Sequence, residues 1–389
     1  MKKSILFILL SLIIESTAYT QNYAVSGEVR DHSTGESIIG ATVVIKSKNS
    51  GAVTNSFGFY SITLPAGNYE MELRCVGYEN FIAPLKLQGN IHKDFELNPI
   101  SFTGGPVIIE GTRKDNVGST DMGKIEIGID QIKKIPVIFG EVDILKTITL
   151  LPGVQSSGEG NAGFYVRGGG VDQNLILLDN STVYNASHLF GFFSVFNADA
   201  VKNIEITKGG GPASYGGRLS SVLDINLKEG NSKSFHGAGG IGTIASRFTV
   251  EGPIKKDTSS FILSGRRTYI DVLTKPFMKP ESGFNGSGYF FYDLNAKFNY
   301  RLSSRDQLFA SMYTGRDVFS FNSSNAGFST RIPWGNTTGT LRWAHQSGSK
   351  LFMNAILTYT DYKFQFEGKQ DQFTFGLSSG IREIGRAHV

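Results

Sequence analysis

Three short apolar runs joined by glycine-rich turns constrain the fold of this chain most. They cover residues 174–178, 200–207 and 221–227, are rich in β-branched or leucine side chains, and are bounded by Gly, Asn or Asp. Runs of this length and composition predict β-strands. The glycine clusters at 168–170 and 209–211 allow tight turns and close backbone approach. The pattern predicts a small, irregular sheet domain.

Short motifs occur in a fixed order along residues 151–225. They are Leu151-Pro-Gly-Val154, Arg167-Gly168, Leu178-Asp179, Ile204-Glu-Ile206, Lys208-Gly209, Ala213-Ser214, Tyr215-Gly216 and residues 222–225. Each motif is weak by itself, but their order and spacing together are hard to obtain by chance. In these motifs the stretch resembles the plug domain of TonB-dependent outer-membrane receptors.

Composition excludes several other classes of protein. The net charge is only +4 and the basic residues are scattered, so nothing indicates a nucleic-acid partner. The single cysteine, Cys75, excludes an internal disulfide and a multi-cysteine zinc site, and we interpret it as a small buried apolar residue. The 47 glycines and 12% aromatic residues favour a turn-rich, mainly β protein of the outer-membrane type.

The first twenty residues predict secretion. Lys2 and Lys3 precede an apolar run at 4–14 that is too short to span a bilayer, and Ser16-Thr-Ala18 is a small-residue cleavage site. We therefore assign residues 1–20 to a signal peptide, with the mature N-terminus between Tyr19 and Asn22. No later segment reaches eighteen apolar residues, so an integral membrane form is expected to be a β-barrel.

Residues 22–99 predict a small β-sandwich. Evenly spaced strands are expected at 25–29, 41–46, 59–64, 69–75 and 91–97, with turn residues between them. The module resembles the carboxypeptidase regulatory-like domain, and we interpret it as a periplasmic spacer. A zinc carboxypeptidase fragment has no support, because His32 and His92 lack the spacing of zinc ligands and fit solvated loops.

Residues 100–123 form a predicted linker. In receptors of the family, the segment before the plug carries the TonB box, which pairs with a sheet edge of TonB. The alternative is an ordinary strand that closes the sandwich. The best match to the box consists of Pro106, Val107, Ile108, Ile109, Glu110, Gly111 and Thr112.

Residues 124–230 are the predicted plug, a mixed α/β domain with a helix at 140–150 that ends before Pro152-Gly153. The resemblance implies ligand contacts on the apical loops 156–163, 169–174 and 184–196, although each residue there has a plain packing alternative. It also implies that Arg167 and Lys208 pair with barrel carboxylates and gate the plug. The candidate ligand residues are Glu159, Asn161, Asp172, Gln173, Tyr184, His188 and Phe190.

Residues 231–382 predict the first part of a transmembrane antiparallel β-barrel. Alternating segments with aromatic ends are joined by short polar turns at one end and longer loops, 275–288 and 320–335, at the other. A soluble sandwich is the alternative, but these segments are long for one. We expect roughly seven strands, at 235–250, 259–270, 289–302, 307–319, 338–346, 350–366 and 372–377.

The last seven residues, 383–389, form an expected foreign tail. The codons GAG ATC GGA AGA GCA CAC GTC encode Glu383-Ile-Gly-Arg-Ala-His-Val389 and resemble the start of a widely used sequencing adapter, whose next in-frame codon is a stop. The alternative is a genuine loop sequence. On the adapter interpretation, native sequence diverges at about Glu383 and the chain is a fragment of a longer receptor.

The resemblance therefore implies a mainly β, non-enzymatic receptor in the outer membrane, with the plug and the N-terminal domain towards the periplasm. Its expected partners are TonB with the inner-membrane energising complex, outer-membrane lipid and a small ligand. Siderophore, cobalamin, oligosaccharide and peptide all remain open as that ligand. No cofactor or metal is expected. The alternative is an exported surface binding or adhesion protein that does not transport.

Overall fold

The computed structural model describes residues 21–48, 50–100, 123–135, 141–158, 162–209, 213–277, 286–323, 327–349, 351–370 and 373–384. The predicted signal peptide and TonB box lie outside these residues, as do Glu159 and Asn161. The N-terminal module forms one compact unit, and the remaining domains form a second. Within the described residues, no helix is long and apolar enough to cross a membrane.

The N-terminal module is a β-sandwich, as predicted. One sheet has the order β4-β1-β7 with β8 also on β1, and the other has the order β3-β2-β5-β6. Alternating apolar side chains from both sheets make its core, and Cys75 is partly buried against it. The strands are β1 (Asn22–Asp31), β2 (Thr42–Ile45), β3 (Ser50–Val53), β4 (Phe59–Pro65), β5 (Gly67–Arg74), β6 (Phe81–Leu87), β7 (Ile91–His92) and β8 (Phe95–Leu97), with a 3-10 turn at Lys46–Lys48.

Two strands of the sandwich are absent from the sequence prediction. Ser50–Val53 lies between the strands expected at 41–46 and 59–64 and overlaps the turn signal Asn49-Ser-Gly51, yet it pairs with β2 along its whole length. Phe81–Leu87 contains Pro84, which an edge strand tolerates because its missing N–H faces away from the partner strand. Both strands lie at the edges of their sheet, where the sequence signal for pairing is weakest.

The middle of the chain folds into a mixed domain, the central domain, around the five-stranded sheet β13-β12-β17-β16-β9. Strand β12 is parallel to β17, and β16 is antiparallel to both β17 and β9. The elements are β9 (Lys124–Gly128), α2 (Ile129–Ile132), α3 (Ile144–Ile148), β10 (Val154–Ser156), β11 (Phe164–Val166), η3 (Val171–Gln173), β12 (Asn174–Leu178), β13 (Ser181–Thr182), β14 (Ser187–His188), η4 (Leu189–Gly191), β15 (Phe193–Ser194), β16 (Val201–Lys208) and β17 (Ser221–Leu227).

The three apolar runs that opened the sequence analysis are the three central strands of this sheet, β12, β16 and β17. The predicted helix is present but short. Asp143 caps the first turn of α3 by accepting a hydrogen bond from the backbone N–H of Lys146 at 3.1 Å. Ile144, Leu145 and Ile148 then pack into the core of the domain.

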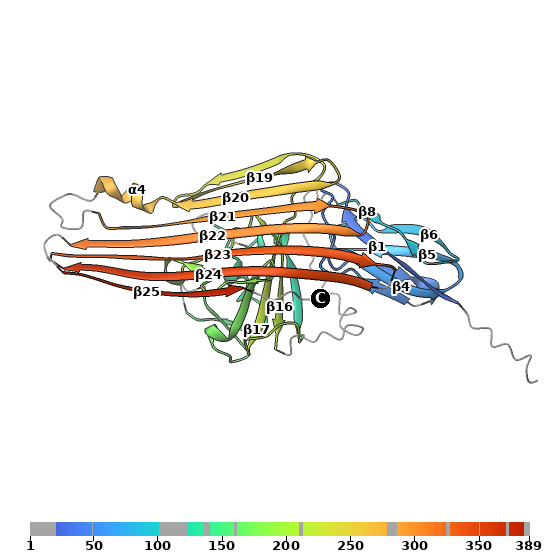
Figure 1. Cartoon of the computed structure of the whole chain (residues 1–389), viewed down its shortest axis with the longest axis horizontal. Coiled ribbons are helices and arrows are strands. Elements are labelled where there is room, and N and C mark those ends of the chain that lie inside the picture. The colour runs from blue at the N-terminus through green and yellow to red at the C-terminus, as the bar shows by residue number, and fades with distance from the viewer. Residues whose placement is uncertain are drawn as a thin grey trace, which may run out of the picture. The chain divides into compact units, whose positions relative to one another are not determined.

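The C-terminal third forms one antiparallel sheet of eight strands, the long sheet, in the simple order β18 to β25 (Figure 1). This is one more strand than expected, because a turn at 242–244 splits the predicted segment 235–250. The elements are β18 (His236–Ile241), β19 (Ala245–Lys255), β20 (Ser259–Thr268), α4 (Ile270–Thr274), a 3-10 turn at Lys275–Phe277, β21 (Gly288–Arg301), β22 (Asp306–Ser323), β23 (Phe328–Ser347), β24 (Leu351–Gln370) and β25 (Phe373–Ile384).

The prediction of a long loop at 320–335 is wrong, because most of these residues belong to strands. Strand β22 continues to Ser323 and β23 begins at Phe328, so these residues lengthen one hairpin. The cross-strand register runs unbroken from Asp306–His345 to Ser323–Phe328, and polar residues at the tip still pair through their backbones. The structure places Glu383 and Ile384, the first residues of the expected foreign tail, in β25.

The two faces of the long sheet differ in character. In β21 the buried residues are alternate ones, from Tyr289 to Lys297, and Leu294 and Phe298 on the other face are exposed. Exposed apolar side chains from four neighbouring strands gather on that face. Phe298, Leu308, Leu341, Trp343 and Leu357 line one depression across β21 to β24. An exposed apolar band on one sheet face is typical of the lipid-facing side of an outer-membrane barrel.

Candidate functional site

Eight charged side chains of alternating sign form a continuous row between the central domain and the long sheet. We call this row the charge chain. Its N···O distances are 3.0 Å (Lys133–Asp199), 2.8 Å (Asp199–Arg247), 3.3 Å (Arg247–Glu141), 3.5 Å (Glu141–Arg266), 2.6 Å (Arg266–Asp293), 2.8 Å (Asp293–His188) and 2.7 Å (His188–Asp317).

The register of the long sheet explains the row. Arg247 in β19 lies opposite Arg266 in β20, Arg266 lies opposite Asp293 in β21, and Asp293 lies opposite Gly315 in β22. Asp317 is two residues further along β22 and therefore points to the same face. A Cβ at Gly315 would collide with the Tyr313 hydroxyl and lie 2.8 Å from Asp293 Oδ1. Glycine at this position leaves room for the hydrogen bonds of the charge chain.

His188 from β14 is the last cation of the charge chain. Its Nδ1 lies 2.7 Å from Asp317 Oδ2 and its Nε2 lies 2.8 Å from Asp293 Oδ1. The imidazole ring stacks on Phe291, with 3.9 Å between centroids and 6° between planes. A ring whose two nitrogens both face carboxylates must donate from both, so His188 is an imidazolium. Burial by itself lowers the pKa of His188, but Asp293 and Asp317 outweigh it and raise the pKa to about 9.

The two carboxylates beside His188 have further donors. Asp293 also accepts from Arg266 and from the Tyr313 hydroxyl at 2.9 Å. Asp317 also accepts from the Tyr289 hydroxyl and, at 3.3 Å, from the backbone N–H of Leu189. These donors offset the desolvation cost of the two buried carboxylates.

The turn after His188 has an unusual backbone. Leu189 and Phe190 both have positive φ angles, 50° and 53°, which side chains other than glycine rarely adopt. The Tyr289 hydroxyl accepts from the N–H of Leu189 at 2.7 Å and so ties this turn to the long sheet. Phe190 is 64% exposed, and its ring lies against Trp334 and Phe319. The turn therefore presents an aromatic side chain beside an aromatic wall.

A second charged group joins the same two domains. Lys297 Nζ of β21 lies 3.1 Å from both carboxylate oxygens of Asp179 and donates to the Leu227 carbonyl at 2.9 Å. The Thr340 hydroxyl donates to the Asp179 carbonyl at 2.7 Å. Near this group, burial and then Glu205 raise the pKa of Asp224 to about 7. Asp179 and Lys297 are both buried, so each depends on the other for charge compensation.

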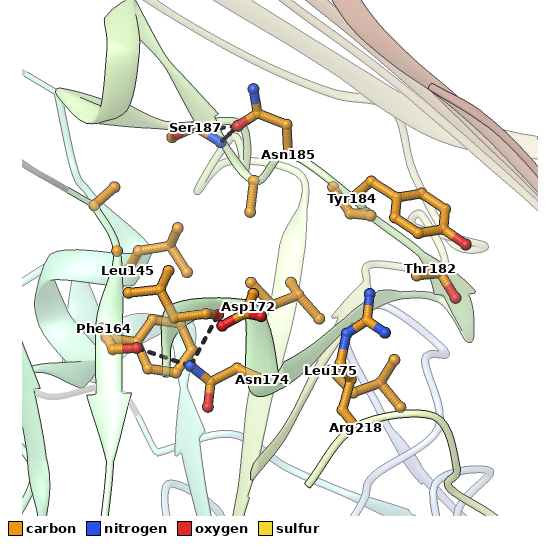
Figure 2. A pocket seen from close by; sticks show the side chains of 16 residues that line it. Leu145, Phe164, Asp172, Asn174, Leu175, Thr182, Tyr184, Asn185, Ser187 and Arg218 are labelled. Atoms are coloured by element: carbon orange, nitrogen blue, oxygen red, sulfur yellow. Dashed lines mark hydrogen bonds between the residues drawn. The ribbon is translucent and has the colours of Figure 1, made fainter. Parts of the chain in front are cut away.

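The central domain also contains a pocket of about 420 Å³. Figure 2 shows the Arg218 guanidinium on the side of the pocket where Thr182 and Tyr184 lie, and Asp172 also lines the pocket. Asn174 holds one wall by donating to the Phe164 carbonyl at 2.8 Å. The pocket thus combines one acid, one base and a phenol with an apolar floor. Its apolar lining includes Leu145, Phe164, Val171, Leu175 and Ile176.

The structure separates the predicted ligand residues. Asp172 and Tyr184 line the pocket, and Phe190 is exposed on its own turn. The Gln173 side chain accepts from the Gly170 N–H at 3.3 Å and closes the short η3 turn. His188 is 1% exposed and both its nitrogens are engaged, which does not fit a ligand contact in this state. Tyr184 donates to Glu383 at 2.8 Å, within the expected foreign tail.

The predicted gating residue Lys208 makes its side-chain hydrogen bond within the central domain. Lys208 donates to the Pro152 carbonyl at 2.6 Å, and burial followed by Arg167 lowers its pKa. Arg167 is exposed, with a φ of 48°. Among the described residues, no ion pair joins either of them to a carboxylate of the long sheet. His188 instead pairs with Asp293 and Asp317 of that sheet, and Asp179 pairs with Lys297. The sequence signal for the ion pairs of His188 is the presence of two carboxylates, Asp293 and Asp317, at inward-facing positions of strands rich in aromatic residues.

Two family models match the chain. The CarboxypepD_reg-like domain matches residues 25–102, and the TonB-dependent Receptor Plug Domain matches residues 127–221. The chain therefore contains a carboxypeptidase regulatory-like domain followed by a receptor plug domain, and we call the central domain the plug from here on. No match was found among curated protein sequences.

Solved structures of outer-membrane receptors are similar to this chain at low identity. The siderophore receptor PirA from Acinetobacter baumannii is 17% identical over 68% of this chain and 48% of its own, with a TM-score of 0.39. The outer membrane transporter YddB from Escherichia coli is 13% identical over 66% of this chain and 42% of its own, with a TM-score of 0.46. The ferric-catecholate import receptor Fiu from E. coli K12 is 13% identical over 69% of this chain and 45% of its own, with a TM-score of 0.44. The chain spans about half the length of these structures.

These features show a TonB-dependent receptor plug domain that packs on an antiparallel sheet with one exposed apolar face. The plug model supports the family resemblance, and the long sheet is an antiparallel sheet like part of a barrel. Its exposed apolar face fits the outer-membrane location predicted from the sequence. Among the described residues, no group of three or more His, Cys, Asp and Glu side chains is placed to hold a metal ion.

Proposed function

We propose that this chain belongs to a receptor that takes up a scarce small ligand across the outer membrane with energy delivered by TonB. Ligand binds to the apical surface of the plug, TonB engages the segment 106–112, and the plug moves away from the long sheet. No covalent bond of the ligand is made or broken. Siderophore, cobalamin, oligosaccharide and peptide remain open as ligand classes.

The observation that carries this proposal is the polar character of the interface between plug and long sheet. Ion pairs such as Arg247–Asp199 and Lys297–Asp179 hold the two domains together. Charged groups regain water when such an interface opens, whereas an apolar core would expose its surface at a larger cost. An interface of this kind supports repeated separation and return.

The ligand surface that we propose has two parts. The pocket beside Asp172, Tyr184 and Arg218 offers charges of both signs over an apolar floor. The exposed ring of Phe190 offers an aromatic contact next to Trp334. Glu159 and Asn161, which lie outside the described residues, remain proposed ligand contacts. Arg167 and Lys208 remain proposed gating residues, with partners beyond the described residues.

Binding to TonB tests the proposal. The exported chain in detergent is titrated with the periplasmic domain of TonB from the same organism, and affinity is measured by calorimetry. Ile108→Pro removes a backbone donor from the pairing strand and should weaken binding at least about tenfold, whereas Ile108→Val should not. Equal binding by Ile108→Pro would place the box elsewhere, and no binding by the wild-type chain would refute TonB coupling.

A further inference from the structure

The site that holds His188 is a preformed receptor for a cation. We call it the His188 socket and define it by Asp293, Asp317, Phe291, Tyr289 and Tyr313. All five residues belong to β21 and β22, and all five are buried. The plug contributes the imidazolium that fills the socket, the backbone N–H of Leu189 and the ring of Phe193. The socket therefore stays on the long sheet when the plug leaves.

The geometry of the socket selects a planar cation. Carboxylate oxygens of Asp317 and Asp293 lie 2.7 and 2.8 Å from the two nitrogens of the imidazole ring. Phe291 lies flat beneath the ring, and a cation over an aromatic face gains from the ring quadrupole. A guanidinium has the same planar shape and donates in the same plane.

The charges left behind by the plug favour a replacement cation. Asp293 keeps Arg266 and the Tyr313 hydroxyl, because both belong to the long sheet. Asp317 loses its cation, since His188 is its cationic partner within the described part of the chain, and keeps the Tyr289 hydroxyl. A carboxylate on an aromatic wall with one phenol donor is poorly compensated and attracts any cation that can reach it.

The wall around the socket suits a ligand that is partly apolar. Phe193, Tyr289, Phe291 and Trp334 form one buried cluster, and Phe319 and Ile332 pack against it. Phe193 leaves with the plug, which uncovers more of the aromatic surface beside Asp317.

We propose that the His188 socket is a cation-binding site of the receptor wall, filled at rest by the plug's own imidazolium and taken by a guanidinium or imidazolium group of the transported ligand once the plug withdraws. This inference rests on the proposed function for the withdrawal of the plug. It narrows the ligand to a compound that carries a cation beside apolar or aromatic groups.

The socket is tested first in the resting protein. His188→Gly empties it, and binding of methylguanidinium to this variant is measured by calorimetry, with N-methylurea as the neutral probe of the same shape. We expect one site per chain and at least about tenfold weaker binding of N-methylurea. Adding Asp317→Asn should abolish binding, whereas adding Asp361→Asn, a carboxylate paired with Lys363 in β24, should not. Equal binding of both probes, or insensitivity to Asp317→Asn, would overturn the proposal.

Folding of the variant is itself informative. If His188→Gly folds only when methylguanidinium is present, that rescue supports the socket. If neither His188→Gly nor His188→Ala folds with methylguanidinium at saturating concentration, the socket does not accept a free cation and the proposal is wrong.

A second measurement links the socket to the wild-type protein. Methylguanidinium binds only the vacated socket, so millimolar amounts should lower the denaturant midpoint for plug release more than N-methylurea does. No difference between the two probes would overturn the role of the vacated socket. Neither measurement involves TonB, so a failure of TonB coupling is distinguishable from a failure of the socket.

Discussion

The ionisation of His188 predicts how tightly the plug is held as a function of pH. Its pKa is raised from the ordinary value of 6.5 to about 9 by Asp293 and Asp317. A base whose pKa is raised by docking stabilises the docked state fully when the pH is below its ordinary pKa. This stabilisation is lost as the pH rises through the raised pKa. The window for His188 is therefore pH 6.5 to 9, with docking weaker at the alkaline end.

The size of this effect follows from the two pKa values. Their difference of roughly 2.5 pH units corresponds to about 3 kcal/mol at 1.36 kcal/mol per unit. This agrees with the cost of removing one partner of a buried ion pair, which is about 3–5 kcal/mol. His188→Gln should therefore weaken docking by about 3 kcal/mol at pH 6.5 and by little at pH 9.5.

Trp334 offers a direct assay because it is buried beside the turn that follows His188. The chain has two tryptophans, so Trp343→Phe leaves Trp334 as the reporter. Urea titrations followed by Trp334 emission give the free energy of plug release at each pH. The pKa of Asp224 is raised from 3.8 to about 7, so Asp224 also makes plug release easier as the pH rises from about 4 to 7. The contribution of His188 is therefore measured above pH 7, where the contribution of Asp224 is largely complete.

His188→Gln in the same background is the control and should show no slope between pH 7 and 9. A wild-type curve as flat as that of His188→Gln would refute the imidazolium assignment. A slope of the opposite sign would also refute it, since that would mean that His188 is neutral when docked.

Three further substitutions test particular contacts by the same urea midpoint. Gly315→Ala should cost about 1–3 kcal/mol by crowding the charge chain, whereas Gly339→Ala, whose Cβ would meet only ordinary contacts, should cost little; equal effects would contradict the crowding. Lys297→Met leaves Asp179 buried without its cation and should cost about 3–5 kcal/mol, largely restored by adding Asp179→Asn. Phe190→Gly should be more stable than Phe190→Ala by about 1 kcal/mol, because the residue has positive φ; the reverse order would contradict the turn geometry.

Local sequence patterns were sufficient for most of the elements. Strands β12 and β17 have the predicted bounds, because short apolar runs between glycines leave few alternatives. The hairpin β22–β23 was shortened in the prediction, because its polar tip has no apolar alternation to reveal pairing. Backbone hydrogen bonds, which every residue can make, extend that hairpin.

The interface between plug and long sheet was beyond sequence reasoning for a different reason. His188 meets Asp293 and Asp317 across 105 and 129 residues, and only the register of three hairpins brings them together. Local spacing cannot give that register. The resemblance indicated basic plug residues paired with barrel carboxylates, but it pointed to Arg167 and Lys208.

The central claim is that the plug leaves the long sheet under the action of TonB. Ser194 tests it, because it is buried at the interface and its carbonyl accepts from Arg266 at 2.8 Å. In a Cys75→Ser background, Ser194→Cys is the only cysteine and is nearly isosteric with the native residue. Whole cells that export the protein are treated with a maleimide, and labelling of position 194 is measured by mass spectrometry.

The account predicts that Cys at position 194 is labelled when TonB is present and the inner membrane is energised. It predicts protection when TonB is deleted, when the proton gradient is collapsed, or when Ile108→Pro is added. Protection under every condition, or equal labelling with and without TonB, would contradict the claim that TonB withdraws the plug from the long sheet.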